Sequence, residues 1–154
     1  MRNTLVALAI AGVLAVLPVH AEMLSKQALP EKVSAQLMQR HPNAIDISAE
    51  LKTHFKQDLY EITFKENDAE HTELYRTDGH FFTNAEKMAS VGEMATTVGE
   101  NLTAEFGQYF IDQSYLVVNP NGAGEEYDLV VNAGGTIWHV TIDRNGGIAR
   151  KEKQ

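Results

Sequence analysis

The sequence predicts an α+β fold in which two tandem helix-strand-strand-strand repeats form an antiparallel sheet with helices on one face. Three observations lead to this prediction. Two segments carry an apolar residue at every fourth position, which is typical of a helix with one buried stripe. Two alternating, strand-like segments share one pattern of tyrosine, acid and then aliphatic residues. Each of these segments is followed, at the same distance, by an Asp-Gly or Asn-Gly turn signal.

The chain begins with the three parts of a secretory signal sequence. A basic start at Arg2 is followed by an apolar run from Leu5 to Leu17 and by small residues at Val19-His20-Ala21. This run is shorter than the ~20 apolar residues that a membrane-spanning helix needs, and Pro18 interrupts it. We therefore expect a signal peptide over residues 1–21, cleavage after Ala21, and a periplasmic or secreted mature protein without a stable membrane anchor.

The mature chain has no cysteine, so disulfides, thiolate catalysis and a lipid-modified cysteine are excluded. A small exported domain without disulfides must be held together by its core. This favours a single compact domain over residues 22–154, made of two repeats at about 27–88 and 92–152.

The mature chain is also acidic. Loss of Arg2 with the signal peptide changes the formal net charge from -8 to -9. Phosphate backbones are bound by clustered Lys and Arg, so this charge argues against nucleic acid as a partner. The acidity is explained either by solubility alone or by a basic protein partner.

In the first repeat, Leu29, Val33 and Leu37 form the apolar stripe of a helix, and Pro30 suits its first turn. Strands are expected over residues 44–51, 59–65 and 71–76, and the turn is Asp78-Gly79. The pattern leaves open a short fourth strand after the glycine turn of each repeat.

In the second repeat, Met94, Val98 and Leu102 form the matching helical stripe. The expected strands are 113–119, 126–132 and 137–143, and the turn is Asn145-Gly146. The separation from Tyr60 to Gly79 equals that from Tyr127 to Gly146, 19 residues in both cases. One spacing shared by elements in the same order indicates a duplication.

The residues that open and close each repeat resemble a known family. The order of these features resembles the pattern of the PepSY-like family of exported bacterial proteins. The features are Leu29-Pro30, His41-Pro42, the tyrosine-acid-aliphatic strands and the late glycine turns. This resemblance covers about residues 27–150 and implies a duplicated fold similar to that of the β-lactamase inhibitory protein.

The second repeat departs from the family pattern, with Met94-Ala95 in place of Leu-Pro and Phe106-Gly107 in place of His-Pro. The inhibitor relies on disulfides that this chain cannot form. A β-lactamase target is therefore not implied.

Strand alternation predicts which side chains face away from the helices. With Tyr127, Leu129 and Val131 toward the helix, a partly apolar surface remains on the other face, and we expect it to bind a partner. It consists of Tyr115, Val117, Val130, His139 and Thr141. Singly exposed Val and Tyr are also ordinary on sheets. In the first repeat, either Leu74 or Tyr75 faces the helix.

The chain lacks the common catalytic motifs: a Gly-rich phosphate loop, a Gly-x-Ser-x-Gly elbow and a His-Glu-x-x-His helix. We expect no catalysis and no cofactor. No metal site is expected either, although His71, Glu73 and His80 are weak candidate ligands around one strand and its turn.

The sequence therefore indicates a non-catalytic, exported PepSY-like binding protein that binds, inhibits or modulates an unknown envelope or extracellular protein through its open sheet face. The alternative is a periplasmic protein that binds a small ligand or a metal ion.

Overall fold

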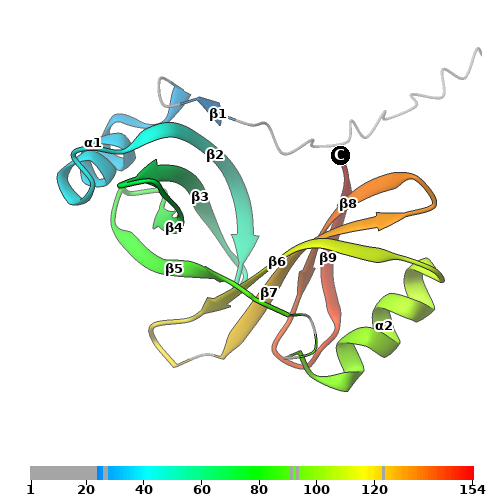
Figure 1. Cartoon of the computed structure of the whole chain (residues 1–154). Coiled ribbons are helices and arrows are strands. Elements are labelled where there is room, and N and C mark those ends of the chain that lie inside the picture. The colour runs from blue at the N-terminus through cyan, green and yellow to red at the C-terminus, as the bar shows by residue number, and fades with distance from the viewer. Residues whose placement is uncertain (1–23, 26–27, 91, 93, 123) are drawn as a thin grey trace, which may run out of the picture.

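The computed structural model describes residues 24–25, 28–90, 92, 94–122 and 124–154. Within them the chain forms one nine-stranded antiparallel sheet in which each strand pairs with the next one along the chain. Two helices lie outside the sheet (Figure 1). The elements are β1 (Leu24–Ser25), α1 (Glu31–Arg40), β2 (Ile45–His54), β3 (Gln57–Glu66), β4 (Ala69–Arg76), β5 (Phe81–Lys87), α2 (Thr96–Phe106), β6 (Phe110–Val118), β7 (Glu125–Ala133), β8 (Thr136–Ile142) and β9 (Ile148–Lys153). The predicted signal peptide lies outside the described residues.

The predicted α+β class with three strands per repeat is wrong, because the molecule is mostly sheet. Its helices have only 10 and 11 residues, and each is followed by four strands. The fourth strand that the sequence left open in each repeat is present, as β5 and β9 directly after the two glycine turns, and β1 is a further strand that was not predicted. Both β5 and β9 carry many exposed residues, so their alternation of apolar and polar side chains is weak. A strand without a strong apolar face gives little signal in the sequence.

Helix α1 forms where the sequence predicts it. Pro30 precedes the first helical residue, where its missing N–H costs nothing, and Arg40 in the last turn suits the negative end of the helix dipole. Its buried residues, Val33 and Leu37, pack in a cluster with Ile62 of β3. The cluster is completed by Leu29, Ala44, Ala49, Phe64 and Tyr75.

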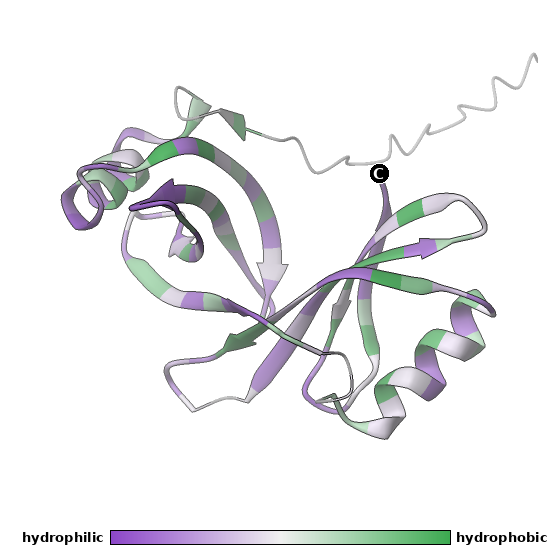
Figure 2. Cartoon of the chain, viewed as in Figure 1, coloured by the Kyte–Doolittle hydropathy of each residue, from purple (hydrophilic) through white to green (hydrophobic). Residues whose placement is uncertain are grey.

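Helix α2 covers the second half of the sheet in the same way. Its buried residues, Val98 and Leu102, pack on Leu129, Val131 and Val140, and Tyr127 and Ile142 complete this cluster. The helix ends at Gly107, whose φ of 68° lies in the left-handed region that glycine accepts without strain. Figure 2 shows hydrophobic and hydrophilic residues alternating along the strands that the helices cover.

Both predicted glycine turns pack against a helix. A Cβ added at Gly79 would lie 2.8 Å from the Cβ of Lys32 in α1, and one added at Gly146 would lie 2.4 Å from Oγ1 of Thr97 in α2. Asn101 also donates a hydrogen bond of 2.7 Å to the Gly146 carbonyl oxygen. Each turn therefore needs glycine for close approach as well as for its positive φ.

Strand β5 joins the two halves of the sheet. Strand β5 pairs with β4 from Thr72–Ala85 to Tyr75–Phe81, and with β6 over only three residue pairs, from Ala85–Val117 to Lys87–Tyr115. In Figure 1, β5 crosses from the half that contains α1 to the half that contains α2. The first residues of β4 consequently have no ladder partner on the β5 side.

The sheet face without helices is not bare, contrary to the expectation from the sequence. It encloses a third apolar cluster of Leu59, Leu74, Phe82, Ala85 and Val117. Leu74 and Tyr75 are adjacent in β4 and both are fully buried, so both faces of this strand are core. The right-handed twist accumulates over nine strands and curls the sheet around its own inner face.

Neither α1 nor α2 is long and apolar enough to cross a membrane.

Candidate functional site

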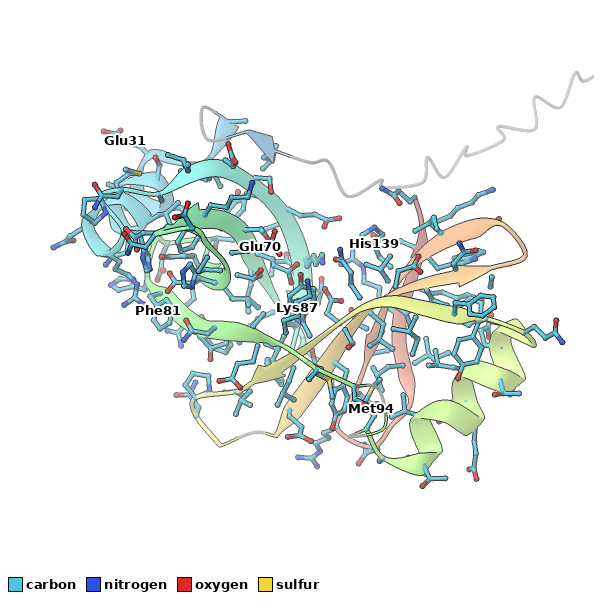
Figure 3. All side chains as sticks on the ribbon, viewed as in Figure 1. Glu31, Glu70, Phe81, Lys87, Met94 and His139 are labelled. Carbon is cyan, nitrogen blue, oxygen red and sulfur yellow. The ribbon has the colours of Figure 1, made fainter. Side chains whose placement is uncertain are left out.

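Six charged side chains meet on the inner face of the curled sheet, where the two halves approach each other. We call them the inner charge cluster: Glu50, Lys52, His54, Glu61, Glu126 and Asp128. They come from β2, β3 and β7. The three residues of β2 alternate along the strand and so share one face. Figure 3 shows side chains filling the space between the halves.

Lys52 is the central cation of the cluster. Its Nζ donates hydrogen bonds of 2.6 Å to Asp128 Oδ2 and 2.7 Å to Glu61 Oε1, and it lies 3.5 Å from Glu50 Oε2. Only 7% of its side chain is exposed. Burial alone would lower the pKa of Lys52, but the charges of Glu61 and Asp128 outweigh burial and hold the pKa above its usual value. Lys52 therefore stays charged in the interior.

His54 is the second cation, and its side chain is fully buried. Its Nδ1 lies 3.2 Å from Glu126 Oε2, and Glu126 Oε1 accepts a hydrogen bond of 3.0 Å from the backbone N–H of Phe55. Burial would lower the pKa of His54, but its carboxylate neighbours Glu126 and Glu61 outweigh burial and raise the pKa to about 9. At neutral pH the imidazole is therefore charged.

The pKa values of the two central carboxylates, Glu61 and Asp128, are shifted in opposite directions although burial acts to raise both. Burial would raise the pKa of Glu61, but the charge of Lys52 outweighs burial and lowers the pKa to about 2. Burial and the neighbouring charge of Glu61 raise the pKa of Asp128. Thr141 donates a hydrogen bond of 3.2 Å to Asp128 Oδ1. Asp128 thus relies on hydrogen bonds from Lys52 and Thr141 to remain buried.

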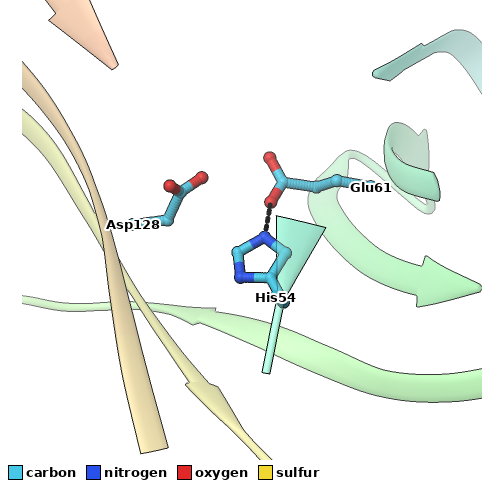
Figure 4. Close-up of side chains that lie close together, drawn as sticks. All are labelled: His54, Glu61 and Asp128. Carbon is cyan, nitrogen blue, oxygen red and sulfur yellow. Dashed lines mark ion pairs between the residues drawn. The ribbon is translucent and has the colours of Figure 1, made fainter. Parts of the chain in front are cut away.

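Two atoms of the cluster lack a hydrogen-bond partner among the described residues: His54 Nε2 and Glu61 Oε2. They face each other at 3.5 Å, a distance that makes an ion pair but no well-formed hydrogen bond (Figure 4). Asp128 approaches the same point from β7. His54, Glu61 and Asp128 each offer one ligand atom, and these three atoms lie within 4.8 Å of one another.

A groove of about 520 Å³ opens where β4 and β5 separate, and we call it the β4–β5 groove. Its lining includes Arg40, His41, Glu70, His71, Glu73, Glu86, Lys87 and Tyr115. The groove is formed by four elements: the start of β4, the end of β5, the end of α1, and β6. In Figure 3 the labelled Glu70 and Lys87 lie on the side of the first half that faces the second half.

Glu73 organises one wall of this groove. Arg40 Nη2 donates a 2.9 Å hydrogen bond to Glu73 Oε1, His41 Nε2 lies 3.0 Å from the same oxygen, and the Tyr75 hydroxyl donates to Oε2. His41 Nδ1 lies 2.7 Å from Glu66 Oε2. Burial would lower the pKa of His41, but its hydrogen bonds to Glu66 and Glu73 outweigh burial and raise it. Arg40, His41, Glu66 and Glu73 in this wall are therefore paired with one another.

The predicted partner-binding residues do not form one exposed surface. Val117 and Thr141 are buried, with 0% and 4% of their surface exposed, because the inner face curls over them. This corrects the expectation that they face outward. Val130 and His139 are half-buried, and half-buried Tyr115 lines the β4–β5 groove. The partner-binding role of these residues stays a prediction.

The weak metal candidates do not converge. His71 and Glu73 both line the β4–β5 groove, but Glu73 is already engaged by Arg40 and His41. His80 lies on an exposed turn, where its Nδ1 is 3.0 Å from Asp78 Oδ1. Sequence reasoning missed the inner charge cluster. Its one local signal is the placement of Glu50, Lys52 and His54 at alternate positions of β2.

No protein-family model matches the chain, and no curated protein matches its sequence, so membership in the PepSY-like family is not confirmed. Solved structures similar to this chain include a BLIP-like protein from Bacteroides fragilis, with 15% identity and a TM-score of 0.44 over 80% of this chain and 85% of that one. A candidate periplasmic protein from Bacteroides eggerthii has 16% identity and a TM-score of 0.49 over 80% of this chain and 88% of that one. A DUF2874 family protein from Bacteroides uniformis has 16% identity and a TM-score of 0.47 over the same shares. Likeness at this distance does not carry a function from those proteins to this chain.

Proposed function

We propose that this chain is an exported, non-catalytic protein that binds a basic segment of an envelope or extracellular protein in the β4–β5 groove. The observation that carries the proposal is the separation of β4 from β5 beside a groove of about 520 Å³. The signal-like start of the chain supports export.

The separated strands offer backbone groups to an extended segment. Ala69, Glu70 and His71 pair with β3 on one side, but their ladder with β5 begins only at Thr72. Unpaired groups at a sheet edge accept an added strand, and nearby side chains then set its specificity. Tyr115, half-buried in the groove, is the aromatic anchor for such a strand.

Charge supports a basic partner. The chain has a formal net charge of -8, and the exposed side chains of Glu70 and Glu86 lie in the groove. Arg40 is neutralised by Glu73, which leaves Lys87 as the opposing cation of fixed charge. Complementary charge raises the association rate and disfavours acidic partners.

The lining favours a peptide over the alternative of a small ligand. A volume of about 520 Å³ lies within the range of small-molecule pockets, but such pockets are lined mainly by apolar side chains. This groove is lined mostly by charged and polar side chains, and Tyr115 is the one Phe, Tyr or Trp among its lining residues.

Site-specific photo-crosslinking tests the proposal. A photoreactive amino acid replaces Tyr115 in one variant and Tyr109 in a matched control, because Tyr109 is also half-buried but lines a separate groove beside α2. A third variant carries it at His139, on the inner face. We expect a basic protein of the envelope to be captured from position 115 and not from 109, and capture to fall as salt rises.

The binding measurement uses the partner captured in that experiment. Tyr115→Ala should weaken binding by about 1–3 kcal/mol, and Tyr109→Ala should leave it unchanged. Equal capture from positions 115 and 109, or capture from position 139 alone, would place binding outside the groove. A captured partner that is acidic would contradict the charge argument.

A further inference from the structure

The two unpartnered atoms of the inner charge cluster are positioned as metal ligands. His54 Nε2 and Glu61 Oε2 are buried, lack a hydrogen bond, and lie 3.5 Å apart. Two ligands about 2.1 Å from one zinc ion at a tetrahedral angle are about 3.4 Å apart. The separation is therefore long for a hydrogen bond but suited to two ligands of a single ion (Figure 4).

Asp128 lies close enough to these two atoms to offer a third ligand atom. One of its carboxylate oxygens lies within 4.8 Å of the ligand atoms of His54 and Glu61. The three side chains come from β2, β3 and β7, so the ion would join the two halves of the sheet. One imidazole and two carboxylates form a nitrogen and oxygen donor set that suits zinc and similar divalent transition metals.

The other nitrogen of His54 is held as metal-binding histidines usually are. Nδ1 lies 3.2 Å from Glu126 Oε2, and Glu126 is fixed in turn by the Phe55 backbone N–H at 3.0 Å. The carboxylate on Nδ1 fixes the orientation of the ring, with Nε2 toward Glu61 Oε2. Glu126 therefore holds the His54 ring from the side opposite Nε2.

The inner charge cluster has an excess of negative charge, which favours binding of a divalent cation. When fully ionised, the four carboxylates exceed the charges of Lys52 and His54 by two. Lys52 occupies Glu61 Oε1 and Asp128 Oδ2, so Glu61 Oε2 remains available. A divalent ion that replaces the proton on Nε2 reduces the excess to one.

We propose that His54, Glu61 and Asp128 form a buried binding site for a divalent transition metal such as zinc, with Glu126 as the residue that positions His54. This inference is independent of the β4–β5 groove and adds a metal site to the proposed function.

Titration of the metal-free protein with cobalt(II) and zinc tests the site. Cobalt(II) in a tetrahedral nitrogen and oxygen environment absorbs visible light far more strongly than the hydrated ion does. We expect this absorption to saturate at one equivalent, zinc to abolish it, and zinc to raise the melting temperature. The absence of both the absorption and the thermal shift at excess metal would overturn the proposal.

Matched variants assign the ligands. His54→Gln and Glu61→Gln should each weaken metal binding more than Glu126→Gln, which only alters the orientation of the imidazole and should weaken binding about tenfold. His80→Gln is the control, since His80 is exposed and lies outside the cluster. Circular dichroism checks that each variant is folded. Undiminished binding in folded His54→Gln would overturn the assignment.

X-ray absorption of the zinc complex of the unaltered protein gives an answer that needs no variant. One imidazole with oxygen ligands is the expected coordination. Two imidazoles would instead place zinc beside His41 and His71, whose rings lie 6.2 Å apart. That result would overturn the proposal even if the cluster variants failed to fold.

Discussion

Lys52 Nζ and Asp128 Oδ2 lie 2.6 Å apart although the two residues are 76 positions apart in the chain. Lys52 belongs to β2 and Asp128 to β7, which are not neighbours in the sheet. A second long-range contact, between His54 and Glu126, runs between the same two strands. These contacts hold the two halves of the curled sheet together across its inner face.

Lys52→Met should destabilise the protein by about 3–5 kcal/mol, because it leaves Glu61 and Asp128 buried without their shared cation. Urea unfolding measures the change. The control is Lys65→Met, which removes an exposed lysine paired with Asp46 and should have little effect. Equal effects of the two substitutions would show that the pairing of Lys52 contributes no more than a surface contact.

Stability should fall at alkaline pH. The pKa of His54 is raised to about 9 in the folded protein, so its contribution is fully present below the unfolded value of 6.5 and is lost as pH rises through about 9. The raised pKa of Asp128 also makes stability fall as pH rises, but over a lower pH range than that of His54. The shift of His54 corresponds to on the order of 3 kcal/mol. Urea unfolding between pH 6 and about 9.5 measures this loss.

His54→Gln should remove most of that alkaline loss, because the substituted side chain does not titrate. On the acid side, the pKa of Glu61 is lowered to about 2, so its contribution is present above 4.5 and is lost as pH falls toward 2. The acid loss should persist in folded His54→Gln. An unchanged alkaline loss in this variant would assign it to other groups.

Glu73→Gln should destabilise the protein by about 1–3 kcal/mol, because Arg40, His41 and the Tyr75 hydroxyl all lose a charged acceptor. Thermal unfolding is the measurement. Glu70→Gln alters an exposed side chain of the same groove and serves as the control. A similar loss in both variants would mean that the paired wall of the groove adds nothing to stability.

Gly146→Ala should cost more stability than Gly134→Ala. Both glycines have positive φ, 82° and 58°, so alanine is strained at both positions. Only at Gly146 does the added Cβ also meet Thr97, whereas no atom lies within 4 Å at Gly134. We expect an extra loss of about 1–3 kcal/mol at Gly146, measured by chemical denaturation. Equal losses would show that α2 shifts to accept the methyl group.

Local patterns predicted much of the secondary structure. The stripes of Val33 with Leu37, and of Val98 with Leu102, are buried as expected. The alternation of β7 was also correct, since Leu129 and Val131 pack with α2. These features depend on periodicity within one element, which a sequence displays directly.

The class of the fold and the inner face were not predictable in the same way. The extra strands β5 and β9 show little apolar alternation. The predicted bare face became core because twist, accumulated over many strands, brings distant segments together. In the pattern of its own strand, each of Lys52 and Asp128 is indistinguishable from a charged residue exposed to solvent. The curled sheet brings them into contact and buries them, and this contact is not visible in the sequence.

Each strand of the sheet pairs only with strands adjacent to it in the sequence, and this topology affects the folding kinetics. In each hairpin, strand pairing can start at the turn and extend outward residue by residue. Most of the ladder therefore forms without closing long loops. The contacts from β2 to β7 span more than 70 residues and carry the largest loop-closure entropy. Substitutions at these contacts should therefore speed unfolding far more than they slow refolding.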